Sequence, residues 1–174
     1  MLSSIANVKR DSDGARPSVP PHVVYACYVG DRSGSMESQQ KASAEGVYEW
    51  VKDISSGCIN NGQEGYMNVV FFDNMSQSRM NYLNVQNVEI SMTQARDWSC
   101  PRGTTKLYDT AIHEINKLRR KVKIHKENNP HITVKGIFQL FSDGYDNCSM
   151  YSKEFLNEAI KAARSEGITC YYLG

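Results

Sequence analysis

Three short segments of the 174-residue chain supply carboxylate and hydroxyl oxygen atoms. Asp31, Ser33 and Ser35 form a D-x-S-x-S pattern, and Asp143 stands in a second segment, Phe-Ser-Asp-Gly. Between them, residues 102–107 (RGTTKL) supply two threonine hydroxyls. Carboxylate and hydroxyl oxygens are hard donors of the kind that magnesium and calcium ions prefer. These residue types therefore indicate a site for a divalent cation.

The charge of these segments favours magnesium. Two carboxylates and three hydroxyls carry too little negative charge for a dedicated calcium cage, whereas magnesium prefers an octahedron of oxygen ligands and keeps some of its water. Mn2+ and Ca2+ are the alternatives. Because hydroxyl ligands add no charge, the ion stays electrophilic and accepts a further carboxylate from outside. We therefore expect a binding site for an acidic side chain and not a catalytic centre.

The hydrophobic pattern predicts the elements that position these residues. Residues 23–30 (VVYACYVG) and 66–73 (YMNVVFFD) are nearly unbroken apolar runs, which are typical of strands buried on both faces. Apolar residues at three- and four-residue steps predict helices over about 37–56, from 107 to about 126, and around 155–163, where Gly167 is the expected cap. Further strands are expected over 132–144 and 168–173, with a more exposed edge strand at 78–85 and an irregular stretch after it.

Strands that alternate with helices predict an α/β fold. We expect a doubly wound, mainly parallel sheet with helices on both faces and one antiparallel edge strand. In such a sheet, ligands bind outside the carboxyl ends of the strands. Asp31 directly follows the first strand, Asp143 lies at the end of the fourth, and the threonine segment precedes a helix. This placement predicts that the oxygen donors meet at one end of the sheet.

The three segments also carry a family resemblance. DRSGSM (31–36), PRGTTKLYDTAI (101–112) and LFSDGYDNCS (140–149) resemble, in the expected order, the metal-ion-dependent adhesion site of von Willebrand factor A domains. The resemblance covers about 22–174 and looks closest to small stand-alone bacterial and phage-like members. It implies a Rossmann-like fold, although the last helix and sixth strand that the family usually has are not present in this sequence.

The resemblance assigns a role to each donor. It implies that Ser33 and Ser35 coordinate the ion directly, and that Asp31 and Asp143 hold it directly or through water. Thr105 is the expected threonine, because the family's threonine lies two residues before a leucine, here Leu107. The metal-ligand set that follows is Asp31, Ser33, Ser35, Thr105 and Asp143. The expected function is a non-enzymatic protein–protein interaction that uses magnesium to bind an Asp or Glu of a partner.

The composition of the chain limits which other kinds of partner are expected. Twenty basic and nineteen acidic residues leave a net charge of +1, so no overall field favours nucleic acid or a membrane surface. No apolar run approaches the ~18–20 residues of a membrane span, and the polar N-terminal arm, residues 1–21, lacks the apolar run of a signal peptide. We therefore expect a cytoplasmic or otherwise intracellular protein. The five cysteines are odd in number and scattered, which indicates free thiols.

Two other functions are consistent with parts of the pattern. The first is a structural or assembly component of a larger particle, or an oligomer, that docks through the arm at 1–21. The second is a magnesium-dependent phosphohydrolase of the haloacid-dehalogenase type, with Asp31 as nucleophile and Asp143 as metal ligand. Ser33 argues against the second, because that family places a second aspartate there. A basic stretch at 117–126 is expected to wrap around its helix as a solvated surface, and Trp98 either joins the core or borders the site.

Overall fold

The computed structural model describes residues 22–174, and the expected arm at 1–21 lies outside the described residues. In chain order the elements are β1 (Val23–Asp31), the 3-10 segment η1 (Gly34–Gln39), α1 (Gln40–Asn60), β2 (Glu64–Phe72), β3 (Ser76–Asn84), the 3-10 segment η2 (Val85–Asn87), α2 (Met92–Trp98), α3 (Leu107–Asn128), β4 (Val134–Phe141), α4 (Lys153–Ser165) and β5 (Ile168–Leu173). Within this part of the chain, every helix is too short or too polar to cross a membrane.

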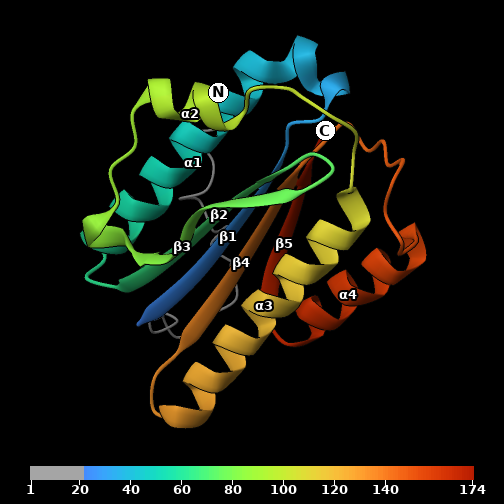
Figure 1. Cartoon of the computed structure of the whole chain (residues 1–174). Helices are drawn as coiled ribbons and strands as arrows, with labels where there is room; N and C mark the ends of the chain where they lie inside the picture. Colours follow the sequence, from blue (N-terminus) through green and yellow to red (C-terminus); the bar gives the residue numbers. More distant parts are fainter. Residues whose placement is uncertain (1–21) are drawn as a thin grey trace, which may run out of the picture.

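The five strands form one sheet in the order β3-β2-β1-β4-β5. β1 pairs in parallel with both β2 and β4, and β4 pairs in parallel with β5. β2 and β3 form an antiparallel hairpin that makes β3 an edge strand. α1 and α2 cover one face of the sheet, and α3 and α4 cover the other (Figure 1). The predicted doubly wound α/β fold with one antiparallel edge strand is therefore confirmed.

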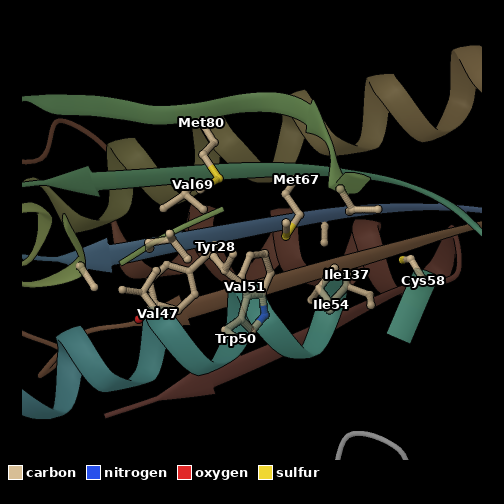
Figure 2. Close-up of a cluster of buried hydrophobic side chains, with 14 of the residues drawn as sticks. Tyr28, Val47, Trp50, Val51, Ile54, Cys58, Met67, Val69, Met80 and Ile137 are labelled. Carbon is tan, nitrogen blue, oxygen red and sulfur yellow. The ribbon is translucent and has the colours of Figure 1, made fainter. Parts of the chain in front are cut away.

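The apolar sequence of β1 follows from its central position. Tyr28 points toward α1, where it packs against Trp50, whereas Tyr25 and Val29 belong to the cluster under α3. Figure 2 shows the α1 side of this core, with Tyr28, Trp50 and Met80 among its members. Because successive residues of a strand point to opposite faces, both faces of β1 must be apolar.

The structure corrects several predicted elements. The helix expected over 37–56 begins within η1 and continues as α1 to Asn60, and the strand expected over 132–144 ends at Phe141. The stretch expected to be irregular contains α2. Its signal is the pattern S-x-x-Q, because Ser91 and Gln94 form a reciprocal capping box at the start of the helix. Trp98 packs against the core on the α1 side.

Candidate metal site

The oxygen donors lie where β1 and β4 end. α1 follows β1 on one face of the sheet, whereas α4 follows β4 on the other face, so the chain diverges after these two neighbouring strands (Figure 1). Such a divergence leaves a crevice at the carboxyl ends of the strands. Three loops border it: the segment from β1 into η1, residues 101–106 before α3, and residues 142–152 after β4.

The first loop brings two hydroxyl groups together beside a buried carboxylate. Asp31 is fully buried, and its Oδ1 accepts a hydrogen bond of 2.8 Å from the Ser33 backbone N–H. Its Oδ2 accepts a hydrogen bond of 2.7 Å from the Ser142 hydroxyl at the end of β4. The Ser33 and Ser35 hydroxyl oxygens are 3.1 Å apart. Ligand oxygens ~2.1 Å from an octahedral magnesium ion are about 3.0 Å from their neighbours, so this pair matches one edge of the octahedron.

Asp143 supplies the second carboxylate from the loop after β4. It is half-buried, and its Oδ1 accepts a hydrogen bond of 3.1 Å from the Tyr145 backbone N–H. Burial raises the pKa of Asp31, and the charge of Asp143 raises it further against the hydrogen bonds from Ser33 and Ser142. The two carboxylates are therefore close enough to repel one another. A cation between them would offset this repulsion.

Thr105 lies in the second loop, which is fastened to both of the others. The Gly34 N–H donates to the Gly103 carbonyl over 3.1 Å, and Gly103 has a φ of +68°, which glycine adopts without strain. The Thr105 N–H donates to Asn147 Oδ1 over 2.9 Å, and its carbonyl accepts from the Asn147 N–H over 3.2 Å. The structure thus brings together the three loops that carry the predicted donors. The Thr105 side chain itself is buried.

The loop after β4 also caps the first turn of α3. Asp146 Oδ1 accepts a hydrogen bond of 2.8 Å from the Leu107 N–H, and the Ser149 hydroxyl accepts from the Tyr108 and Asp109 N–H groups over 3.0 and 3.2 Å. The residue before the helix, Lys106, provides no side-chain cap. Asp and Ser are typical capping residues, but Asp146 and Ser149 lie about forty positions away from the helix start in sequence. Capping patterns in a sequence concern only residues next to the helix. This contact between distant segments could not be predicted from the sequence.

A buried ion pair beneath the site was also not predicted. Arg32 and Asp73 are each only 2 % exposed, and Arg32 Nη2 lies 3.0 Å from Asp73 Oδ2. That contact lies outside hydrogen-bonding geometry, and Arg32 Nε has no partner within the described part of the chain. Asp73 also accepts from Arg102 Nε over 2.9 Å and from the Met75 N–H over 2.9 Å. The Lys106 N–H donates a hydrogen bond of 2.9 Å to the Asp73 carbonyl. Through Arg102 and Lys106, Asp73 therefore anchors both ends of the loop at residues 101–106.

The chemistry of the donors fits magnesium. Among residues 22–174, no group of three or more His, Cys, Asp or Glu side chains is arranged to hold a metal ion. A metal at this end of the sheet would therefore need hydroxyl ligands beside Asp31 and Asp143. Ser33 and Ser35 offer them in contact with one another. The set is all oxygen, which is the type that magnesium prefers.

No protein-family model and no curated protein matches the sequence. Among solved structures, the chain is similar to proximal thread matrix protein 1 from the mussel byssus, with a TM-score of 0.52 and 18% identity over 87% of this chain and 36% of that one. It is similar to the vWF domain of the type V pili tip protein Mfa5 from Porphyromonas gingivalis, with a TM-score of 0.50 and 14% identity over 78% and 44%. It is also similar to the pilus adhesin SpaC from Lactobacillus rhamnosus GG, with a TM-score of 0.56 and 17% identity over 91% and 24%.

The chain thus spans less than half the length of each of these three proteins. The mussel protein has also been solved with zinc in its MIDAS motif, the metal-ion-dependent adhesion site. At this level of identity the likeness concerns the fold. The strand order, the helices on both faces and these structural neighbours together show that the chain has the von Willebrand factor A fold.

Proposed function

We propose that this domain is a magnesium-dependent module that binds an acidic side chain of a protein partner. The proposed ligands are Asp31, Ser33, Ser35, Thr105 and Asp143, and Mn2+ or Ca2+ are the alternatives to magnesium. The observation that carries the proposal is the pair of hydroxyl oxygens 3.1 Å apart beside the buried Asp31. Two carboxylates leave the ion with attraction for one more anion, and an Asp or Glu would complete the octahedron.

Exposed apolar side chains next to the site support a protein as the partner. Tyr145 is 70% exposed and Met150 is 85% exposed, and both belong to the loop that follows Asp143. Aromatic residues and methionine are enriched where proteins contact one another. The structural neighbours include a pilus adhesin, a pilus tip protein and a thread matrix protein, which also supports a role in attachment or assembly.

The site does not favour the phosphohydrolase alternative. A nucleophilic aspartate must reach the substrate, but Asp31 is fully buried and each of its oxygens accepts a hydrogen bond. Ser33 stands where that chemistry requires an acid and base, and a serine hydroxyl cannot serve at neutral pH. A magnesium-dependent phosphatase assay on the purified chain checks this: we expect no turnover above that of the Asp143→Ala variant.

Thermal unfolding with and without magnesium tests the metal site. An ion that binds only the folded state stabilises it by about 2.7 kcal/mol at a hundred times its dissociation constant. For a domain of this size that corresponds to a rise in melting temperature of about 5–10 °C. Asp143→Ala should remove the rise, whereas Asp97→Ala, an exposed carboxylate at the end of α2, should keep it. A wild-type protein indifferent to magnesium, manganese, calcium and chelator would overturn the proposal.

The open coordination position has its own test. Protein-bound Mn2+ that keeps exchangeable water enhances the relaxation of water protons, and a carboxylate that displaces this water lowers the enhancement. We expect titration with a short Glu-containing peptide to lower it, and the matched Gln-containing peptide to have no effect. Equal responses to both peptides would mean that the ion does not select a carboxylate.

A further inference from the structure

A hollow of about 460 Å³ lies against the second half of α3, far from the oxygen donors. α3 begins beside the candidate metal site and runs to the end of the sheet where β1 and β4 start (Figure 1). Tyr25 of β1 forms one wall of this hollow. The other wall comes from α3 and includes Lys117, Arg120, Lys121, His125 and Asn128. We call this site the basic hollow.

The basic residues of α3 divide into two sets on different faces of the helix, so the basic stretch wraps around its helix as the sequence predicts. Lys117, Lys121 and Asn128 follow one another at steps of about one or two helical turns and so share a face with Arg120. The other basic residues point elsewhere: Arg119 forms an ion pair with Glu166, Lys126 donates to the Glu166 carbonyl, and Lys123 lies 3.8 Å from Glu127. Half of the basic stretch therefore lines one cavity.

The charge of the basic hollow is poorly balanced. Among residues 22–174, none of those that line the hollow is acidic. Lys117 lies 3.8 Å from the buried Glu114, but neither Arg120 nor Lys121 forms an ion pair with a residue in 22–174. On the strand side, Glu64 accepts a hydrogen bond from the Tyr66 hydroxyl. Two cations that face one cavity without partners give it an attraction for anions.

A strained tyrosine holds two of these cations together. Tyr82 has a φ of +50°, and within the described part of the chain it is the only residue other than glycine with a positive φ. Regular alternation would turn Tyr82 to the same face as Met80. The register of the β2–β3 pairing shifts between Met80 and Leu83, and Met80 packs under α1 while Tyr82 packs under α3. The Lys117 and Lys121 ammonium groups then lie 5.5 and 5.6 Å from the centre of the Tyr82 ring.

Such a backbone conformation costs on the order of 1 kcal/mol or more and persists only where its surroundings maintain it. Here it places one aromatic ring within reach of two like charges, and the ring attracts both of them. The two walls of the hollow are also joined, because the Tyr25 hydroxyl and His125 Nδ1 are 3.0 Å apart and the two rings pack edge to face. The basic hollow is therefore built before any ligand arrives.

We propose that the basic hollow binds a small soluble anion with more than one phosphate group. A single carboxylate would engage one cation, whereas adjacent phosphates engage Arg120, Lys121 and Lys117 at once. Arginine binds phosphate oxygens in pairs, and the Asn128 amide adds neutral donors. A volume of about 460 Å³ is in the range of small-molecule sites. This proposal does not depend on the metal site.

The test is calorimetric titration of the full 174-residue chain with inorganic triphosphate, in chelator and at about 0.15 M salt. The chelator removes metal, so binding at the other end of α3 does not contribute. Arg120→Gln with Lys121→Gln removes the two unpaired cations. Lys123→Gln with Lys126→Gln is the matched control, because it removes the same charge from the same helix on faces that turn away from the hollow.

We expect saturable binding that falls about tenfold or more in the Arg120 and Lys121 double variant, because each charged hydrogen bond contributes more than a neutral one. The control should stay within about twofold of wild type. Side-chain amide signals of Asn128 should shift on titration. Absence of saturable binding, or equal losses in both double variants, would overturn the proposal. Tighter binding of a DNA oligonucleotide that weakens in both double variants would instead indicate an extended nucleic-acid surface.

Discussion

Replacing Asp73 with alanine should destabilise the domain far more than replacing an exposed residue that contacts the same carboxylate. Asp73 is 2 % exposed, and it is the only acidic group that pairs with the equally buried Arg32 within residues 22–174. Asp73→Ala leaves this guanidinium in the interior without a counter-charge. Arg102 is different, because its side chain is 51% exposed and water solvates it when the carboxylate is gone.

The structure sets the size of the effect. Breaking a buried ion pair by removing one partner costs about 3–5 kcal/mol. The Met75 N–H also loses its acceptor, which adds about 1 kcal/mol, while the exposed Arg102 pair contributes at most about 1 kcal/mol. We expect Asp73→Ala to lower the free energy of unfolding by about 4–7 kcal/mol. In a domain of this size the melting temperature should then fall by about 10–20 °C.

The effect should depend on pH with a defined sign. Burial raises the pKa of Asp73, but the Met75 N–H and the two arginines outweigh it, so the folded-state pKa is lowered. A lowered folded-state pKa means that Asp73 contributes stability above its unfolded pKa of about 3.9, and that this contribution is lost as the pH falls through the folded value. The difference between wild type and Asp73→Ala should therefore be constant between about pH 5 and 7 and should shrink below about pH 4.

Urea unfolding of four proteins measures these quantities. They are the wild type, Asp73→Ala, Arg102→Ala and the double variant Arg32→Met with Asp73→Ala. The double variant should recover most of the lost stability, because no buried charge is left unpaired. If Asp73→Ala costs no more than Arg102→Ala, or if Arg32→Met gives no recovery, the buried charge does not determine the stability and the reasoning fails.

Two further outcomes are expected. Asp146→Ala removes the acceptor for the Leu107 N–H and should lower the free energy of unfolding by about 1 kcal/mol. Ser152→Ala, at the start of α4, should lower it by less than about 0.5 kcal/mol, because the Ser152 side chain makes no cap hydrogen bond. Thermal unfolding compares the two variants, and equal costs would contradict the capping of α3 by the distant loop. Iodoacetamide should modify the exposed Cys148 in the folded protein, but Cys27 only after unfolding, because Cys27 is buried and burial raises its pKa to about 12. Peptide mass spectrometry measures the labelling of both cysteines. Rapid labelling of Cys27 in native buffer would contradict its burial.

The predicted fold and the expected meeting of the three loops come from local patterns. A central parallel strand must be apolar on both faces, so β1 and β4 stand out in the sequence, and the residues at or just after their ends are placed at one end of the sheet by topology alone. This is why Asp31 and Asp143 could be placed without a structure. The fold is confirmed, whereas the metal ligands remain a prediction.

The contacts that fix the loops could not be predicted in this way. Arg32 and Asp73 are 41 positions apart in the sequence. An ion pair between two such distant segments produces no periodic pattern from which it could be predicted. The orientation of Tyr82 could not be predicted for another reason. One extra residue in β3 turns its side chain to the other face of the sheet, and the alternation of apolar and polar residues does not reveal such a bulge. The short helix α2 was missed although its capping box is a local signal, because its seven residues are too few for a clear apolar stripe.

These missed contacts bear directly on the candidate metal site. A binding site is strong when its donors are already positioned, because binding then pays little to order them. Here the positions are fixed by groups that are not themselves proposed ligands: Ser142 holds Asp31, Asn147 holds the Thr105 backbone, and Asp146 ties the loop after β4 to the first turn of α3. A shift of the loop that carries Asp143 would uncap α3. The first turn of this helix, whose second half carries the basic hollow, is therefore tied by these hydrogen bonds to the loop that carries Asp143.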